Sequence, residues 1–424
     1  MKTTKVVIIG AGSVAFGPSA IGDIYLSKDL WGSTLALVDL NEEALERAGK
    51  LCEKLNEHTG AGFKIETHTG RRDALPGAEF IINCTVIERN KYWKQDFTIP
   101  KKWGIRHTLG ENGGPGGLFF TLRTIPMVMD IAHDIEELCP DAYFLNFSNP
   151  ESRIILALGR YTRLRAIGLC HGIFMARGDI SHILGRDEEE IDLFGAGLNH
   201  FQWMLGMHEA GTGKDLYPEF REAEKNFDPG FEPLCRTMYR AFGYYPSCSD
   251  DHMGEYVAYG YEGGEDGYDF DDDESWRVEL KEKIEGAIAG TTPAMEFLEA
   301  SGERVAQTIS GILHNKHIEI EAGVIYNQGA ISNLPADAAV EVPIVLDGDG
   351  IHPVSIGDLP DALARILNIQ VMVQQMSVDA AVHGSKEMAL QALLMDPVVN
   401  STKAAKGLLD ELWEINKQFI RPCI

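Results

Sequence analysis

The segment KVVIIGAGSVA, at residues 5–15, carries the clearest signal of fold in the chain. Its first part, Lys5 to Ile9, is an apolar run that predicts a buried strand, and a glycine turn leads from it into a helical pattern. The turn matches G-x-G-x-x-A, in which small residues let the backbone approach a pyrophosphate held at a helix N-terminus. The alternative is that these glycines serve only a tight turn. The residues expected to contact a dinucleotide are Gly10, Gly12, Ser13 and Val14.

A second apolar run, Leu35 to Val38, ends at Asp39, and either Asp39 or Asn41 can cap the helix that follows. A carboxylate at the end of this strand accepts hydrogen bonds from the adenosine ribose hydroxyls, so the sequence favours NAD over NADP. Two further apolar runs contain Thr85 and Asn146 near their ends. Doubly wound folds place such groups near the nicotinamide, so we expect both residues to bind the cofactor.

Strands alternate with helical segments through the first half of the chain. Strands are predicted at Phe80 to Thr85, Tyr143 to Phe147 and Ala166 to Leu169, and a helix at Leu122 to Leu138. This alternation predicts an α/β protein with an N-terminal Rossmann-like, doubly wound parallel sheet.

After about Phe194 the alternation gives way to longer helices and an extended segment, Glu319 to Val345. The last helices are expected within Asp358 to Leu394 and Ser401 to Lys417. A chain of 424 residues exceeds what one core usually serves. We therefore expect an NAD-binding Rossmann domain at 1–195 and an α+β substrate-binding and oligomerisation domain at 196–424.

The charge balance excludes some partners. The chain has 64 acidic and 38 basic residues, a formal net charge of −26, and such a surface repels nucleic acid and anionic membranes. Part of the excess lies in the run Glu262 to Glu274, which most simply predicts a solvated loop. No segment has the apolar length of a membrane span, and the N-terminus lacks the pattern of a signal peptide. The seven cysteines form no C-x-x-C pair, which favours reduced thiols and a cytoplasmic protein.

Polar residues follow several apolar runs in the middle of the chain. Cys170 and His200 each come at such a position, and a thiolate with an imidazole can hold a divalent metal while leaving coordination positions open for substrate. From the residues alone, an inert buried cysteine and a hydrogen-bonded core histidine remain the alternative. A second glycine-rich stretch, Gly110 to Gly117, is either a functional loop or a flexible connection.

These motifs together resemble the NAD- and metal-dependent glycosidases of glycoside hydrolase family 4, and the resemblance extends over nearly the whole chain. The motifs that carry it are GAGS at Gly10 to Ser13, GGPGG at Gly113 to Gly117, Ser148-Asn149-Pro150, Cys170-His171-Gly172, Asn199-His200, and NQGAISNLPADAAVEVP at Asn327 to Pro343. The family is an exception to the two-carboxylate mechanism of glycoside hydrolysis.

The resemblance implies a redox-neutral elimination. Tightly held NAD⁺ oxidises the sugar C3 hydroxyl, the ketone acidifies the C2 proton, and the metal stabilises the enediolate. A base removes that proton, the glycosidic oxygen leaves C1 with acid help, water adds, and NADH reduces C3 again.

The resemblance also implies residue roles. Cys170 and His200 match the ligands of a divalent metal, usually Mn²⁺, and Asn149 matches an asparagine that touches sugar hydroxyls. His171 is the candidate general acid. The candidate bases are Asp250, which we favour, then Asp251 and Tyr256. Further candidate substrate residues are Glu111, Asn112 and Arg123.

The resemblance implies that the substrate is an unphosphorylated α-glycoside, because the motif Cys170-His171-Gly172 is similar to the one in family members that act on such sugars. An anionic sugar, a uronide or sulfosugar, remains an alternative, since several basic residues lie in nearby loops. A sugar or 2-hydroxy-acid dehydrogenase would share the Rossmann half but need no metal cysteine, and a non-catalytic NAD sensor would have no use for Cys170 and His200 together. The resemblance further implies a homodimer or homotetramer.

Overall fold

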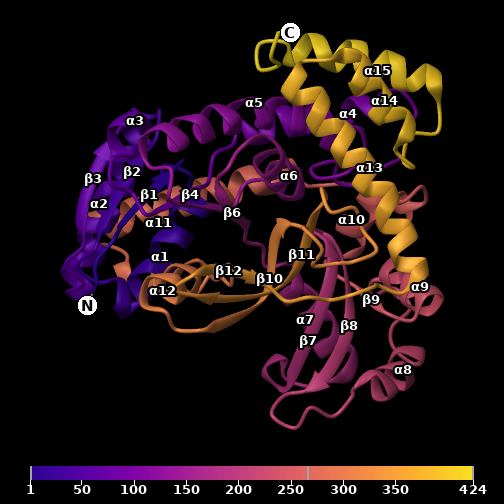
Figure 1. Ribbon diagram of the computed structural model, residues 1–424, viewed down its shortest axis with the longest axis horizontal. Helices are drawn as coiled ribbons and strands as arrows, with labels where there is room; N and C mark the ends of the chain where they lie inside the picture. Colours follow the sequence, from indigo (N-terminus) through magenta and orange to yellow (C-terminus); the bar gives the residue numbers. More distant parts are fainter. Residues whose placement is uncertain (1, 265–266, 423–424) are drawn as a thin grey trace.

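The computed structural model describes residues 2–264 and 267–422 and places both halves of the chain on one mixed sheet (Figure 1). The strands are β1 (Lys5–Ile9), β2 (Thr34–Val38), β3 (Lys64–His68), β4 (Phe80–Asn83), β5 (Tyr143–Asn146), β6 (Arg165–Gly168), β7 (Ile191–Leu198), β8 (Phe201–Glu209), β9 (Tyr245–Pro246), β10 (Ile318–Tyr326), β11 (Ala339–Asp347) and β12 (Gly350–Pro353).

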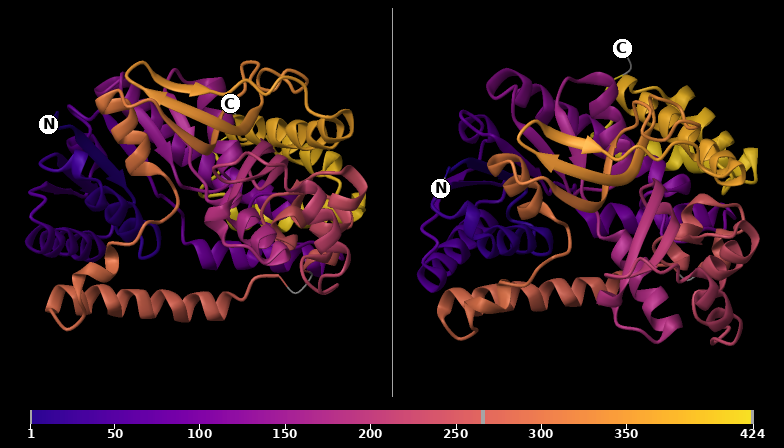
Figure 2. Two further views of the ribbon diagram at one scale, coloured as in Figure 1. Left: turned by 90° about the horizontal axis from the view of Figure 1, so that it is seen from below. Right: turned by 60° about the horizontal axis from the view of Figure 1, so that its bottom comes forward.

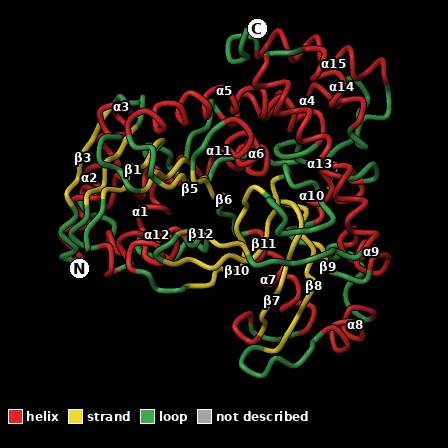
Figure 3. The backbone as a smooth tube through the Cα atoms, viewed as in Figure 1, coloured by secondary structure: helices red, strands yellow, loops and turns green. Residues whose placement is uncertain are grey.

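The helices pack on both faces of this sheet and at its far end (Figure 3). They are α1 (Phe16–Leu26), α2 (Glu42–Thr59), α3 (Arg71–Ala74), α4 (Arg89–Lys102), α5 (Gly114–Leu138), α6 (Glu151–Tyr161), α7 (Gly172–Leu184), α8 (Tyr217–Lys225), α9 (Pro233–Phe242), α10 (Asp250–Met253), α11 (Phe270–Ala289), α12 (Val305–His314), α13 (Asp361–His383), α14 (Lys386–Met395) and α15 (Thr402–Asn416).

The sheet begins as a Rossmann sheet. Its first strands run parallel in the order β3-β2-β1-β4-β5-β6, as in dinucleotide-binding folds. The sheet continues from β6 through antiparallel β10, β11, β7, β8 and β9, with β12 paired to β11. This arrangement confirms the predicted α/β fold class with its α+β second half.

The strand register brings the carboxyl ends of the parallel strands together. Ile9 pairs with Asn83, Asn83 with Asn146, and Asn146 with Gly168, each at the last position of its strand. Residues that follow these strands therefore meet at one edge, where ligands bind in open α/β sheets.

The expected boundary between two domains at 195/196 falls inside β7, because the sheet runs through both halves. The division into two domains thus remains a prediction. Asn41, rather than Asp39, caps α2, since its side chain accepts a hydrogen bond from Ala44 N at 3.1 Å.

Two glycine-containing segments differ from expectation. The predicted helix at Leu122 starts instead at Gly114, so much of the glycine-rich stretch is the first turn of α5. Gly116 lies so close to Gly110 that an added Cβ would meet Gly110 O at 2.2 Å. The predicted helical region Asp358 to Leu394 is broken at Gly384, which has a φ of +63° and ends α13.

The acidic run Glu262 to Glu274 is not wholly a solvated loop. Its last residues form the start of α11, and Asp273 is buried there; Glu265 and Asp266 lie outside the described residues. Figure 2 shows α11 running alongside the molecule from the second half of the chain back to the first, where it packs on α2.

Within residues 2–264 and 267–422, no helix is long and apolar enough to cross a membrane. The six cysteines in this part of the chain are all free thiols, and Cys423 lies outside it.

Candidate active site

The first glycine loop is shaped for a phosphate-bearing ligand. Gly10 has a φ of +86°, and a Cβ there would lie 2.7 Å from Cys84 O. A Cβ on Gly12 would lie 2.6 Å from a carboxylate oxygen of Asp39. A side chain at either position would collide with the protein, so only glycine allows a turn this tight, as in the loops that bind dinucleotides.

Asp39 stands at the end of β2 beside this loop. Its Oδ2 accepts from Gly12 N and its Oδ1 from Asn41 N, both at 2.9 Å. Each oxygen has a second lone pair, which leaves the carboxylate able to accept hydrogen bonds from ribose hydroxyls.

The ends of β4 and β5 are tied into one polar network. Asn83 donates to Asn146 Oδ1 at 2.9 Å and accepts from Thr85 Oγ1 at 2.7 Å. Asn146 in turn donates to Ser148 O at 2.8 Å. Thr85 and Asn146 therefore lie together at the sheet edge where a nicotinamide would sit.

Helix α11 borders the dinucleotide loop. Ile284 lines a small hollow together with Gly12, Ser13 and Val14, and Lys281 lies 3.4 Å from Glu43 on α2. The helix therefore links the second half of the chain to the cofactor loop.

The two predicted metal ligands meet. Cys170 Sγ lies 3.5 Å from His200 Nε2. Two such atoms bound to one ion, at bond lengths of about 2.3 and 2.1 Å and angles of 90–110°, would lie roughly 3.1–3.6 Å apart. The pair therefore fits a shared divalent metal. His200 has a φ of +60°, an unfavourable backbone conformation that aims its ring at Cys170.

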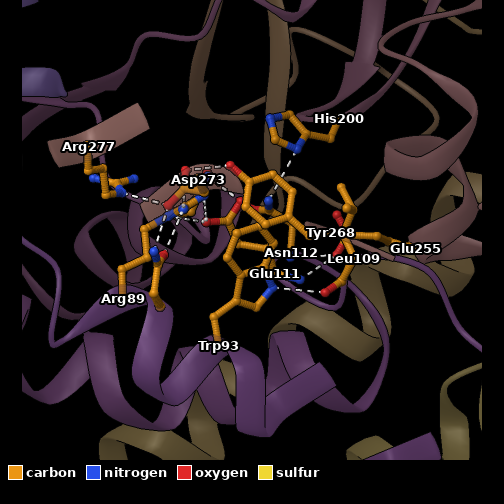
Figure 4. Close-up of polar contacts among 12 residues, drawn as sticks. Arg89, Trp93, Leu109, Glu111, Asn112, His200, Glu255, Tyr268, Asp273 and Arg277 are labelled. Carbon is orange, nitrogen blue, oxygen red and sulfur yellow. Dashed lines mark hydrogen bonds and ion pairs between the residues drawn. The ribbon is translucent and has the colours of Figure 1, made fainter. Parts of the chain in front are cut away.

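Asn112 holds the other side of the imidazole. Its Nδ2 lies 3.2 Å from His200 Nδ1, as Figure 4 shows. With the amide turned by 180°, its oxygen would accept the Nδ1 proton and leave the Nε2 lone pair for a metal. Asn112 thus contacts the candidate metal ligand His200 directly.

Buried carboxylates surround Cys170 and favour a cation. Burial and the charges of Glu151, Glu341 and Glu303 raise the pKa of the Cys170 thiol well above its usual value. One oxygen each of Glu151 and Glu303 has no hydrogen-bond partner among the described residues. Burial also raises the pKa of Glu151, Glu303 and Glu341, so a bound divalent ion would stabilise the charged forms of these carboxyls and of the thiol.

His171 follows Cys170 and precedes α7. Its Nδ1 lies 2.7 Å from Glu303 Oε1, and this contact raises the pKa of His171 despite partial burial. The side chain is half exposed. A protonated, accessible imidazole is suited to donate a proton.

Glu111 and Asn149 form the polar wall next to this centre. Asn149 donates to Glu111 Oε2 at 3.1 Å, and Arg89 Nη2 lies 3.1 Å from Glu111 Oε1. Glu111 is buried, so its two oxygens are fixed in direction. This arrangement can bind sugar hydroxyls.

Glu255 fixes the loop that carries these residues. Its Oε2 accepts from the backbone N–H groups of Glu111, Asn112 and Gly113 at 2.7, 2.7 and 2.9 Å. Burial raises the pKa of Glu255 to about 7, although the hydrogen bonds oppose this.

The carboxylate of the favoured base, Asp250, is already occupied by backbone hydrogen bonds. Its carboxylate accepts from Leu234 N at 2.8 Å and Cys235 N at 2.6 Å, at the start of α9. Its own N–H donates to Glu232 at 2.5 Å. The possible ligand atoms of Glu232, Cys235 and Asp250 lie within 4.8 Å of one another, and the hydrogen bonds give this cluster a structural role.

Asp251 contacts His252, which lies beside His200. Its Oδ1 lies 2.8 Å from His252 Nδ1, and the His252 ring packs 4.9 Å from the His200 ring. Burial raises the pKa of Asp251, but contacts with His252 and Ser249 hold it at about 2. Tyr256 is buried, stacks on Phe201, and donates to Asn199 O at 3.2 Å.

Arg123 does not face this wall. Its guanidinium pairs with Asp96 at 2.5 Å and donates to Asn416 at 2.9 Å, and all three side chains are buried. The expected substrate contact is therefore corrected to a structural ion pair, because the charge is already satisfied inside the α4–α5–α15 packing.

The site thus unites most predicted residues and adds others. Around Cys170 and His200 it gathers Asn112, His171, Asp251 and, through Glu111, Asn149. Four side chains were not predicted: Glu255, Glu303, Glu341 and Asp273. Each is an Asp or Glu in an apolar or acidic stretch, and the residues that it contacts are far away in the sequence. No local pattern therefore distinguishes it from a surface carboxylate. For Asp273, the nearby aromatic residues Tyr268 and Phe270 indicate that this segment packs against the protein rather than lying in solvent.

Comparison with known proteins adds independent evidence. Residues 5–186 match the family described as "Family 4 glycosyl hydrolase", and residues 195–399 match its C-terminal domain. The chain is 32% identical to an alpha-glucosidase of Erwinia rhapontici, with 96% of each chain covered. It is 34% identical to an alpha-galactosidase of Bacillus subtilis (strain 168), with 96% of this chain and 95% of the relative covered.

Among solved structures, the fold is similar to that of a 6-phospho-alpha-glucosidase from gut microorganisms, solved in complex with NAD and Mn²⁺. The TM-score is 0.86 over 100% of both chains, at 24% identity. This likeness bears on the fold.

Proposed function

The chain belongs to glycosyl hydrolase family 4, and from this premise we propose that it hydrolyses an unphosphorylated α-glycoside with NAD⁺ and a divalent metal, Mn²⁺ in the first place. The observation that carries the proposal is the pair of Cys170 and His200, 3.5 Å apart, at the same sheet edge as a dinucleotide loop. A dehydrogenase would need the loop but not the thiol and imidazole pair. The relatives named alpha-glucosidase and alpha-galactosidase support a glycosidase.

The cofactors supply the chemistry that side chains lack. When bound, NAD⁺ takes a hydride from the sugar and returns it, and the metal acts as a Lewis acid toward the sugar oxygens. Gly10, Gly12 and Asp39 would hold the dinucleotide, and Cys170 with His200 would hold the metal. The NAD and Mn²⁺ found with the similar 6-phospho-alpha-glucosidase support both assignments.

We assign the base to Asp251 among the three candidates. The Asp250 carboxylate already accepts two backbone hydrogen bonds, and Tyr256 is buried under Phe201. Asp251 is ionised, partly exposed and connected through His252 to His200. It would remove the C2 proton once oxidation at C3 has acidified that position.

The remaining residues hold the sugar and protonate the leaving group. His171, kept protonated by Glu303, would donate to the glycosidic oxygen as it departs. Glu111 and Asn149 would bind sugar hydroxyls and orient the ring over the metal pair.

A neutral sugar fits the charges better than an anionic one. Arg89 is the cation nearest to Glu111 in this wall, and its charge is shared between Glu111 at 3.1 Å and Asp273 at 3.8 Å. A uronide carboxylate would have to compete with both acids and with the buried carboxylates near Cys170.

A panel of nitrophenyl α- and β-glycosides, including glucosides, galactosides and uronides, tests the proposal. We expect nitrophenol release from an α-glucoside or α-galactoside only when NAD⁺, Mn²⁺ and a reductant are all present. Release from uronides alone would replace the neutral sugar with an anionic one. Stoichiometric NADH without nitrophenol would refute the glycosidase and indicate a dehydrogenase.

A further inference from the structure

A row of alternating positive and negative side chains extends from Glu111, in the polar wall, to helix α11. Arg89 on α4 contacts Glu111 through Nε at 3.2 Å and Nη2 at 3.1 Å, and its Nη1 lies 3.8 Å from Asp273. Asp273 also accepts from Arg277, one turn further along α11, at 2.7 Å. Figure 4 shows the four side chains close together, with dashed lines marking the contacts of Arg89 and Arg277.

Asp273 is fixed more tightly than a surface acid. Besides Arg277, its carboxylate accepts from Tyr268 Oη at 2.6 Å and from Asn90 Nδ2 at 2.7 Å. Burial alone would raise the pKa of Asp273, but these hydrogen bonds hold it below the usual value. The residue therefore carries its negative charge at neutral pH.

The aromatic side chains around Arg89 limit its movement. The guanidinium lies over the Trp93 ring at 4.2 Å from the centroid and near Tyr268 at 5.6 Å. Trp93 in turn donates to Leu109 O at 2.8 Å, next to the loop that carries Glu111. Arg89 can therefore reorient little unless one of its two acidic partners is removed.

The four charges cancel. Arg89 and Arg277 contribute two positive charges, and Glu111 and Asp273 contribute two negative charges. Without the Asp273 charge, these four side chains would carry one net positive charge. Arg89 would keep its contacts to Glu111, and its Nη1, which now faces Asp273, would be available to an incoming anion.

We propose that Asp273 is a positioning residue that determines specificity: it neutralises Arg89 and holds it against Glu111, so that the site accepts an uncharged sugar and disfavours an anionic one. This inference rests on the proposed glycosidase function. It gives a role in sugar selection to a residue of the acidic run, which otherwise looks like a solvated segment.

The test compares Asp273→Asn with two other variants. Asp273→Glu restores the charge, and Asp271→Asn removes an acid in the same turn of α11 whose side chain is exposed and pairs only at the surface with Lys94. For each protein, kcat/KM is measured on a nitrophenyl α-hexoside and on the corresponding α-hexuronide, at saturating NAD⁺ and Mn²⁺.

We expect Asp273→Asn to shift the hexuronide-to-hexoside ratio of kcat/KM by about tenfold or more toward the uronide, the size of one charge-assisted contact. In Asp273→Glu, which keeps the negative charge, the ratio of kcat/KM should lie close to the wild-type value. In Asp271→Asn it should stay within about twofold of wild type. A general loss of packing would lower both rates and leave the ratio unchanged, and that result would overturn the proposal.

A binding measurement separates this inference from the proposed function. The dissociation constants of free hexose and hexuronate are measured by calorimetry on each NAD⁺- and Mn²⁺-loaded protein. If wild type binds sugars but cleaves no glycoside, the glycosidase proposal fails, while the shift in the ratio of dissociation constants still decides the role of Asp273. An unchanged ratio in Asp273→Asn refutes that role, and failure of wild type to bind either sugar overturns both.

Discussion

Replacing Arg123 with methionine would leave Asp96 as an unpaired carboxylate in the protein interior. The two side chains are 2% and 0% exposed, and their contact at 2.5 Å is accompanied by a hydrogen bond from Arg123 to Asn416. Removing one partner of a buried ion pair typically costs 3–5 kcal/mol, so we expect Arg123→Met to lower the free energy of unfolding by about 4 kcal/mol. Methionine keeps much of the apolar volume, so the loss reports mainly on charge.

The loss should depend on pH. Burial raises the pKa of Asp96 to about 6 even with Arg123 present, and removing the guanidinium raises it further. A carboxyl whose pKa is higher in the folded than in the unfolded state binds extra protons on folding, so its contribution to stability falls as pH rises. Arg123→Met should therefore be less destabilised at pH 5.5 than at pH 8.

Urea unfolding followed by tryptophan fluorescence, at both pH values, measures this effect. The double variant Arg123→Met, Asp96→Leu should recover much of the lost stability, because no buried charge remains. Catalytic KM should change less than about threefold in the folded protein. If Arg123→Met lost less than about 1 kcal/mol of stability and its KM rose tenfold or more, the structural role would be refuted. Arg123 would then be a substrate-binding residue, as first expected.

Three further predictions follow from the site. Cys170→Ser should reduce Mn²⁺-dependent turnover at least about a hundredfold while NAD⁺ affinity, measured by calorimetry, stays the same; full turnover in a chelator would remove the metal from the mechanism. Asp39→Asn should weaken NAD⁺ binding about tenfold and reduce the preference for NAD⁺ over NADP⁺. Equal affinity of the wild type for NAD⁺ and NADP⁺ would contradict a role of Asp39 in binding the ribose hydroxyls. Burial raises the pKa of Asp179 and Glu255 to about 7 and of Glu341 to about 8. The protein without metal and NAD should therefore lose about 1 kcal/mol or more of unfolding free energy between pH 6.5 and 8.5. A urea midpoint that rises over this range would contradict these pKa shifts.

Local patterns predicted the parts of the fold that depend on neighbours in the chain. The strand at Lys5 to Ile9 and the helices near the C-terminus follow from apolar periodicity, and the parallel, doubly wound first half follows from the alternation of strands and helices. The start of α5 was less predictable, because Gly114 to Gly117 have poor helix propensity. There the close approach to Gly110 and the hydrogen bonds to Glu255 override propensity.

The sequence places Cys170 and His200 after separate apolar runs, and the fold brings the two side chains together. The carboxylates were harder, because Asp250 and Asp251 are adjacent in the chain yet one caps α9 and the other contacts His252. Arg123 was misplaced because its partner, Asp96, lies on another helix, and sequence alone does not reveal such pairs.

The most direct test of the account is solvent deuterium at C2 of the released sugar. Hydrolysis of the α-glycoside that wild type cleaves is run in D₂O with NAD⁺ and Mn²⁺, and the product is examined by proton NMR. We expect about one deuteron at C2 of the product and no accumulation of NADH. Exchange at C2 should be lost in Asp251→Asn and retained in Asp250→Asn. Nitrophenol release with no deuterium at C2 would contradict proton abstraction at that carbon and with it the eliminative mechanism.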